Sequence, residues 1–321
     1  MKLLPRFLAL ATTVLTISAS LPAATPAAAG SILLPGSPAA GPFTEAVLFG
    51  FDDRAFPFRD NVETRLFTGQ KPRLVLRPGP PGSHDEALLY YGTVIRIGDT
   101  FHLWYNGNYG PMRPLPGFER EKCVIAYATS KDGINWVKPE LGLVEFNGSK
   151  KNNIVNFPVP NLWSTCAILH DPEDPDENRR FKMAYLEKFE DGMKFCVAFS
   201  KDGLHWVPSP KNPVGPFLEM AGVAKHQGFY FVNGQASLTA HHKIPVRRLV
   251  TFVSKDFETW SPAGAMGFDR GADVTGPSSD DKLHQYEEIH LGAALWNRSN
   301  VLLGIYGPVS YTHLRAHETK A

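Results

Sequence analysis

The heptad "SKDGINW" at residues 130–136 returns as "SKDGLHW" at residues 200–206 and, in a degraded form, as "SKDFETW" at residues 254–260. Each copy ends an apolar, β-rich run, and the runs before it follow the same order. Such a repeat is typical of a fold assembled from similar units. The heptad therefore indicates the architecture before any single residue is given a role.

The first two units each predict three strands before the heptad. In the first unit these are "ALLYYGTVIRI" (87–97), "TFHLWYNG" (100–107) and "KCVIAYATS" (122–130), with a tight turn at Gly98 and Asp99. In the second they are "TCAILH" (165–170), "RRFKMAYL" (179–186) and "KFCVAFS" (194–200). The stretch "HDPEDPDEN" predicts a tight acidic hairpin, with a calcium loop formed by Asp171, Asp174 and Asp176 as the alternative.

The third unit predicts "GFYFV" (228–232), a hairpin at Asn233 and Gly234, "QASLTAHH" (235–242) and "RRLVTFVS" (247–254), and a fourth begins with "EEIHLGAALW" and "NVLLGIYG". Four-stranded units of this kind predict an all-β fold, a β-propeller in which each small sheet buries both faces against its neighbours. About three and a half such units are present. A β-sandwich is the alternative.

The heptad itself is expected to be scaffolding. If the innermost strand runs from one end of the propeller axis to the other, the heptad forms the turn from the third to the fourth strand. Asp132 and Asp202 suit this turn because their carboxylates accept bonds from backbone N–H groups, and Gly133 and Gly203 permit unusual dihedral angles. Three tryptophans are expected to start the outer strands and pack between sheets: Trp136, Trp206 and Trp260.

The ends of the chain suggest a domain plan. Residues 1–29 resemble a signal peptide, because Lys2 and Arg6 precede an apolar run and small residues precede a cleavage site near Ala29. We therefore expect a secreted or periplasmic protein, with a retained N-terminal anchor as the alternative. Residues 30–71 are expected to form a linker and lead-in segment, and residues 72–308 an incomplete propeller.

The tail "VSYTHLRAHET" within residues 309–321 matches the translation of a common sequencing adapter. We expect the native sequence to depart from this chain near Pro308 and the natural protein to continue. A genuine polar tail is the alternative.

The composition excludes several classes of partner and site. Lys plus Arg number 33 and Asp plus Glu 32, and no basic run stands out, so neither nucleic acid nor, after signal cleavage, a membrane is an expected partner. The three cysteines show no C-x-x-C spacing and are expected to be buried small residues: Cys123, Cys166 and Cys196. No cofactor or metal is implied.

Several motifs carry a resemblance to a known group. They are "FHLWYNG", then "IAYATSKDGINWVKPELGLVEFNGSKKNNIV", "RRFKMAYL" with "VAFSKDGLHW", and "HLGAALWNRSNVLLGIYG", within about residues 72–307. The "KPELGL" connection is the most specific of them. With these motifs the chain resembles the five-bladed β-propeller glycoside hydrolases, the group of invertase-like and arabinanase-like enzymes, and is most similar to secreted bacterial proteins related to the family 32 N-terminal propeller.

The resemblance implies a five-bladed fold with a pocket at one end of the central axis. It also implies hydrolysis by two carboxyl groups, one of which protonates the leaving oxygen while the other activates water or attacks directly. The sequence departs from the better-known members, since it lacks W-M-N-D-P-N-G, R-D-P and a Glu-Cys pair at the expected places. The usual catalytic trio therefore cannot be carried over.

Position alone suggests the candidate carboxyl groups. The stretch "SHDEALLYY" places His84, Asp85 and Glu86 before the first innermost strand, at the rim of the expected pocket, with a solvated turn as the alternative. The stretch "HQYEEIHLG" places Glu287 and Glu288 at the start of the fourth, where adjacent acids are costly to bury without a role.

Further candidates come from neighbouring loops. Glu187 lies near the turn between the second and third strands of the second unit, whereas Glu190 there fits a surface charge. His226 precedes the "GFYFV" strand and is a substrate-binding candidate, with a core histidine as the alternative. The other candidates for substrate binding are His84, Tyr109, Arg113, His284, Tyr286 and His290, and Arg120 lies in the same loop as Arg113.

We therefore predict a secreted carbohydrate-active protein that hydrolyses glycosidic bonds of a poly- or oligosaccharide, with catalytic carboxyl groups drawn from Asp85, Glu86, Glu187, Glu287 and Glu288. Phosphorolysis on the same fold would show as a dependence on phosphate. The alternative, from a different class, is a non-catalytic propeller that binds glycan or protein, because a fold does not fix a function.

Overall fold

The computed structural model describes residues 47–50, 56, 58, 60–63, 65, 73–110, 122–238, 246–263, 287–289, 292–298, 300–305 and 308–310. The chain forms two compact units, residues 1–46 and 47–321, and the fold below concerns the second. The predicted signal peptide, much of the lead-in segment and residues 311–321 lie outside the described residues.

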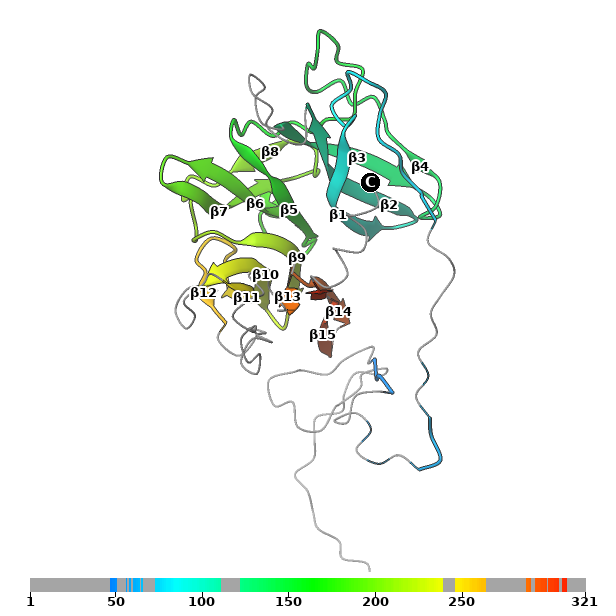
Figure 1. Ribbon diagram of the computed structural model, residues 1–321, viewed down its shortest axis with the longest axis vertical. Coiled ribbons are helices and arrows are strands. Elements are labelled where there is room, and N and C mark those ends of the chain that lie inside the picture. Colours follow the sequence, from blue (N-terminus) through cyan, green and yellow to red (C-terminus); the bar gives the residue numbers. More distant parts are fainter. Residues whose placement is uncertain are drawn as a thin grey trace, which may run out of the picture. The chain divides into compact units, whose positions relative to one another are not determined.

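The described strands form three four-stranded antiparallel sheets in which each strand pairs with the next (Figure 1). The first sheet consists of β1 (Leu88–Ile97), β2 (Thr100–Tyr109), β3 (Lys122–Ser130) and β4 (Trp136–Val137). The second consists of β5 (Leu162–His170), β6 (Phe181–Phe189), β7 (Gly192–Ser200) and β8 (Trp206–Pro208). The third consists of β9 (Glu219–His226), β10 (Phe229–Leu238), β11 (Val246–Ser254) and β12 (Ser261–Pro262).

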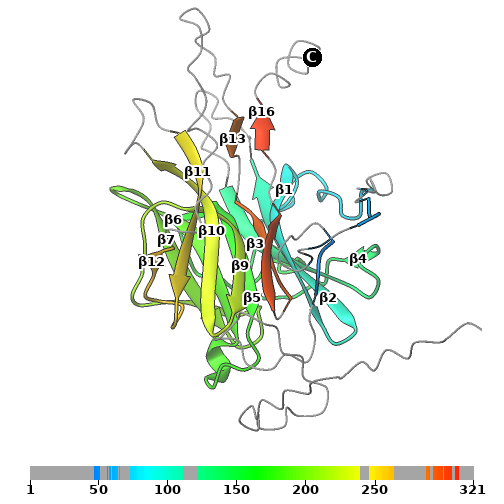
Figure 2. The same ribbon diagram turned by 90° about the horizontal axis from the view of Figure 1, so that it is seen from below.

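The fourth unit is a long hairpin in two parts. β14 (Ala294–Arg298) pairs with β15 (Val301–Ile305), and β13 (Glu287–Ile289) pairs with β16 (Pro308–Ser310), beside which it lies in Figure 2. The strands expected in "EEIHLGAALW" and "NVLLGIYG" are therefore present.

The first strands of the units are neighbours in space. β1 lies against β5, β5 against β9, and β9 against β14. Later strands of each sheet lie progressively farther from this inner row, as expected of propeller blades. The predicted all-β, propeller fold of four-stranded sheets is confirmed.

Two apolar cores fill the spaces between successive sheets. Between the first and second sheets, Trp104 and Tyr127 pack with Met183 and Trp206. Between the second and third sheets, Phe195 and other side chains of β6 and β7 pack with Leu218, Met220 and Phe257. Neighbouring residues of a strand point to opposite faces, so one sheet can contribute to two cores.

The heptads form the predicted turns between third and fourth strands. In the second sheet, Asp202 Oδ1 accepts bonds from Leu204 N and His205 N, each at 2.8 Å, while Gly203 has a φ of 75°. The same turn recurs at Asp132 and Asp256. The predicted turn between third and fourth strands is therefore confirmed.

One heptad also ties two sheets together. The carbonyl oxygen of Gly203 accepts the indole N–H of Trp206 at 2.8 Å and that of Trp104, from the first sheet, at 2.7 Å. Trp206 therefore packs between sheets as predicted, and Trp260 packs against the next core. Trp136 instead packs against a buried cluster of the first sheet, formed by Tyr105, Ala126 and Ala128.

The prediction for the third sheet was wrong in its strand order. Asn233 and Gly234 lie in the middle of β10, whereas the hairpin is at Gln227 and Gly228. The innermost strand is β9, which the sequence analysis did not assign. Asn-Gly is the common hairpin dipeptide, but Asn233 Oδ1 here accepts the N–H of Ala293 from the fourth unit, a contact that no local pattern shows.

Two smaller predictions are confirmed, one on the acidic segment after β5 and one on the burial of Cys166 and Cys196. The acidic segment after β5 is a hairpin containing one 3₁₀ turn, η1 (Glu177–Arg179), capped by Asp176. Cys166 and Cys196 are buried, burial raises the pKa of each thiol to about 12, and Cys123 is partly buried.

Within the described residues no three His, Cys, Asp or Glu side chains are grouped to hold a metal ion. In this described part of the chain, no helix is long and apolar enough to span a membrane.

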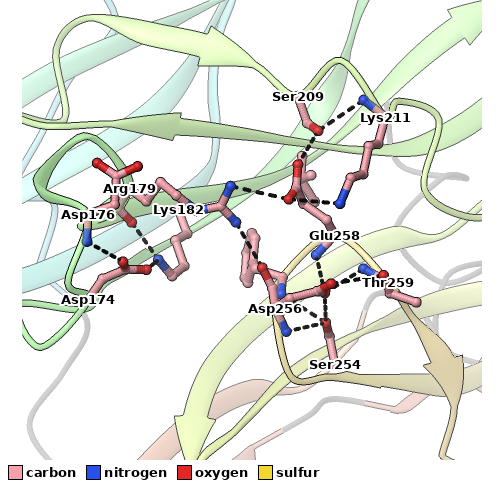
Figure 3. A network of polar contacts seen from close by, with 12 residues as sticks. Asp174, Asp176, Arg179, Lys182, Ser209, Lys211, Ser254, Asp256, Glu258 and Thr259 are labelled. Carbon is pink, nitrogen blue, oxygen red and sulfur yellow. Dashed lines mark hydrogen bonds and ion pairs between the residues drawn. The ribbon is translucent and has the colours of Figure 1, made fainter.

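Ion pairs and hydrogen bonds of Glu258, in the third heptad, also join the second and third sheets (Figure 3). Glu258 accepts bonds from Ser209 Oγ at 2.5 Å, Arg179 Nη1 at 3.2 Å and Lys211 Nζ at 3.3 Å. Arg179 also donates to the carbonyl of Asp256 at 2.9 Å. This clasp links η1 and the end of β8 to the third heptad.

Gly203→Ala should destabilise the protein more than Gly133→Ala. Both glycines have positive φ, 75° and 71°, so each alanine costs about 1–2 kcal/mol of backbone strain. A Cβ at position 203 would lie 2.6 Å from Trp104 Cζ2, whereas at position 133 the nearest atom is 4.0 Å away. Overpacking should add roughly 1–3 kcal/mol at position 203 only. Urea unfolding of both variants measures the difference, and equal losses would contradict the close packing.

Glu258→Gln should make the stability of the protein fall less steeply than that of the wild type as the pH is lowered into the acid range. Burial alone would raise the pKa of Glu258, but the bond from Ser209 and the charge of Arg179 hold it below its usual value. A depressed pKa adds stability that is present above the unfolded value, about 4.3, and lost as pH falls through the folded one. Melting temperatures of wild type and variant from neutral pH into this acid range test it. Parallel curves would refute the clasp, and Glu190→Gln, at an exposed turn, is the control.

Candidate functional site

The units share a common direction, which gives the propeller two distinct ends. Each heptad follows a third strand, so the heptads lie where the first strands finish. The later halves of β1, β5, β9 and β14 line a single cavity there. We call this the heptad end, and the opposite end, where β1, β5, β9 and β13 begin, the loop end.

Glu219 is a functional candidate that the sequence analysis missed. It is the first residue of β9 and so leads into an innermost strand at the loop end, where a catalytic carboxyl was expected. Gln235 Nε2, on the paired strand β10, donates to Glu219 Oε2 at 2.9 Å. Because "GFYFV" was predicted as the innermost strand, Glu219 was assigned to no strand and given no role. The alternation of "EMAGVAKH" before the Gln227–Gly228 turn was the available signal.

Glu187 lies near the end of β6, also at the loop end, as predicted. Its side chain is partly buried, and burial raises the pKa of its carboxyl. The hydroxyl of the fully buried Tyr185 donates to Glu187 Oε2 at 3.3 Å. Glu187 therefore holds its proton to a higher pH than an exposed glutamate, which is the property of a general acid.

The fourth unit places two more predicted acids at the loop end. Glu287 and Glu288 form the start of β13, opposite Ser310 and Val309 of β16. Their side chains lie outside the described part, as do four other predicted residues: Arg113, His284, Tyr286 and His290. Tyr109 ends β2 at the loop end, and its ring meets the ring of Phe146 edge-on at 4.9 Å.

Asp85 is placed in a buried ionic network over the first sheet. It is 1% exposed and accepts bonds from Lys138 Nζ at 2.5 Å, Tyr105 Oη at 2.9 Å and Ser83 Oγ at 3.1 Å. Burial alone would raise the pKa of Asp85, but the hydrogen bonds from Lys138 and Tyr105 keep it low. The bonds from Tyr105 and Lys138 tie the loop 79–85 to β2 and to the segment that follows β4.

Glu86 also joins backbone segments. Its carboxylate accepts the N–H of Gly82 at 2.5 Å and that of Gly110 at 3.4 Å. The side chain is partly exposed. These contacts connect the loop before β1 with the end of β2, and the catalytic role predicted for Glu86 stays a prediction.

His84 lines a cavity of about 490 Å³ beside this network. The cavity lies between the loop 79–85 and the segment 138–153, which follows β4. Burial lowers the pKa of His84, whose side chain is almost fully enclosed. The predicted residues His84 and Asp85 are therefore brought together, on the first sheet and its covering loops.

His226 lies at the other end of the molecule from its predicted place. It ends β9, directly before the Gln227–Gly228 turn, and its Nδ1 is 3.0 Å from Asn297 Oδ1. The misassigned innermost strand caused this error. His226 contributes to the heptad end, where an axial cavity of about 620 Å³ is lined by residues of β1, β5, β9 and β14.

Comparison with known proteins gives little on function. No family model matches the chain. Two uncharacterized proteins of Mycobacterium tuberculosis are each 25% identical to it over 154 residues, which cover 46% of this chain and 46% of each relative. The chain thus spans about half the length of the curated relatives it matches.

Solved structures similar to this chain are glycoside hydrolases. The GH32 beta-fructofuranosidase BmSUC1 of Bombyx mori has 14% identity and a TM-score of 0.40, with 69% of this chain and 42% of that one covered. Fructan 1-exohydrolase IIa from Cichorium intybus has 17% identity and a TM-score of 0.36, with 57% and 32% covered. Glycoside hydrolases, the group that the sequence motifs resemble, are thus among the solved structures similar to this chain. Likeness at this level assigns no role to any residue.

Asp85→Asn should lower stability because it leaves Lys138 without its carboxylate. Their side chains are 2% and 25% exposed, so the loss should be about 2–3 kcal/mol, below that of a fully buried pair. In a double-mutant cycle, Lys138→Met in the Asp85→Asn background should recover part of it. Urea unfolding gives the free energies, with Glu86→Gln as the more exposed control. Additive effects of the two substitutions would contradict the ion pair.

Proposed function

We propose that this chain is part of a secreted carbohydrate-active protein that hydrolyses glycosidic bonds at the loop end of the propeller. The observation that carries the proposal is a pair of carboxyl groups in contrasting environments. Glu187 is partly buried beside Tyr185, and Glu219 starts β9 with an amide donor from Gln235. The strands β6 and β9 that hold these acids are in contact.

The two environments support different chemical roles. The raised pKa of Glu187 favours the protonated form and suits the acid that protonates the leaving oxygen. The hydrogen bond from Gln235 fixes the orientation of Glu219, whose carboxylate would act on water or on the sugar carbon. Glutamates that differ in this way are the usual means by which one site holds both an acid and a base.

Glu287 and Glu288 remain candidates for the same site. β13 begins at the loop end, as β9 does, so both backbone positions are on the side where Glu219 lies. Asp85 is a weaker candidate than the sequence suggested, because Lys138, Tyr105 and Ser83 already bind its carboxylate. We therefore assign the reaction to Glu219 and Glu187, with Glu288 next.

Glu219→Gln and Glu187→Gln should each lower sugar release by about 10²-fold or more in the natural full-length protein, because each removes a proton donor or acceptor. Glu187→Gln should also remove the alkaline limb of the pH profile, since the acid must stay protonated. Chromatography of products from a polysaccharide panel gives both results. Glu190→Gln, at an exposed position three residues from Glu187, is the matched control and should keep wild-type activity.

Unchanged turnover in Glu219→Gln, Glu187→Gln and Glu288→Gln would refute these assignments. Calorimetric glycan binding by the wild type with no product would instead favour a non-catalytic glycan-binding propeller. Release that requires inorganic phosphate and yields a sugar phosphate would change the reaction to phosphorolysis on the same site.

A further inference from the structure

We propose that the cavity over the first sheet is a second binding site, which takes one neutral sugar unit and is separate from the carboxyl groups of the loop end. Its walls are the loop 79–85 and the segment 138–153. Its volume of about 490 Å³ lies within the range of sites for small ligands, roughly 300–1,000 Å³. The site neither includes Glu219 or Glu187 nor depends on hydrolysis.

The imidazole of His84 indicates that this cavity is built for a ligand. His84 is 5% exposed and lines the cavity, and among the described residues its Nε2 has no hydrogen-bond partner. The nearest carboxylate oxygen, Asp85 Oδ1, is 4.0 Å away, beyond hydrogen-bond distance. A buried polar atom without a partner costs about 1–3 kcal/mol. A ligand hydroxyl at Nε2 would remove that cost.

The charges around the cavity favour a neutral ligand. Burial lowers the pKa of His84, so its ring is uncharged at neutral pH. Lys138 is paired with Asp85, and at the rim the exposed Glu140 and Lys151 carry opposite charges. An anion would find no unpaired buried cation, and a metal ion no cluster of ligands among the described residues. A neutral imidazole can donate to or accept from a hydroxyl, depending on its tautomer.

The remaining walls suit the carbon skeleton of a sugar. Phe146 is partly buried, lines the cavity, and meets the His84 ring edge-on with centroids 5.9 Å apart. Three prolines add apolar surface: Pro80, Pro81 and Pro139. A few polar groups set in a largely apolar wall are typical of small-molecule sites, and an aromatic ring offers a surface to sugar C–H groups.

The two walls are held together before any ligand binds. Lys138 Nζ donates to the carbonyl of Arg77 at 2.8 Å, and Asn147 Nδ2 donates to the carbonyl of Gly82 at 3.0 Å. Asn153, which lines the cavity, donates from Nδ2 to Tyr105 Oη at 2.8 Å, and this bond fixes the orientation of its side chain. Such preorganisation reduces the entropy that binding must overcome.

The test follows the His84 imidazole by ¹⁵N NMR in the full chain. Methyl glycosides of glucose, galactose, mannose and arabinose are titrated, with glucuronate, inorganic phosphate and Zn²⁺ as charged probes. At least one neutral glycoside should shift the His84 Nε2 resonance in a saturable way, with a Kd in the millimolar range. No shift with any neutral glycoside, or saturation by a charged probe alone, would overturn the proposal.

Substitutions in the cavity wall test whether the glycoside binds there. By calorimetry, which needs no imidazole signal, His84→Ala should bind at least about tenfold more weakly, which corresponds to about 1.4 kcal/mol. His205→Ala, at an exposed histidine of the second heptad, should bind as wild type. Phe146→Ser keeps the His84 resonance and should weaken binding similarly, so the test survives if His84→Ala does not fold. Wild-type affinity in Phe146→Ser would overturn the role of the cavity.

The binding site over the first sheet and the hydrolytic activity at the loop end can be refuted separately. Glu219→Gln should abolish sugar release and leave the His84 titration unchanged. Loss of the titration in Glu219→Gln would show that the two sites are one and would overturn the separate site.

Discussion

The fold depends on a carboxylate that caps the turn at the end of each third strand. Asp202 accepts two backbone N–H groups and so frees the carbonyl of Gly203 to accept indole N–H bonds from both Trp206 and Trp104. The first of these tryptophans starts an outer strand and the second belongs to the neighbouring sheet. A local turn thereby becomes a junction between sheets. The third heptad keeps the turn with Phe257, at a φ of 66°, and buries that ring in the next core.

Because the heptads and the ionic clasp of Glu258 bind the sheets at one end, the other end is available for function. Glu187 and Glu219 lie there, on contacting strands of adjacent sheets. Among the described residues, buried charges elsewhere are paired: Asp85 with Lys138, Asp171 with Lys225 at 2.9 Å, and Lys182 with Asp174 at 2.5 Å. An acid whose charge is matched by a lysine within the fold is held in place, whereas burial beside a neutral hydroxyl raises the pKa of Glu187 and suits it to proton transfer.

Much of the fold was predictable from the sequence, and much of the site was not. The alternation of apolar residues and the turn chemistry predicted the first, second and fourth units correctly, because those signals are local. The third unit failed at Asn233 and Gly234, a favourable turn dipeptide that tertiary contacts hold inside a strand. That one error moved His226 to the wrong end and concealed Glu219. A single misplaced strand inverts the predicted direction of its neighbours, so their residues are assigned to the wrong end of the sheet.

The sequence by itself determined the repeat, the four-stranded units, the role of the heptad and the burial of the cysteines, since each follows from residues close together in the chain. Only the tertiary structure decided which acids are paired with a lysine. Asp85 meets Lys138 across 53 positions, and the indole of Trp104 reaches Gly203 across 99. The unpartnered nitrogen of His84 is likewise a property of the walls around it. Charge pairing and burial depend on distances in space. For residues far apart in the chain, those distances are set only when the sheets pack.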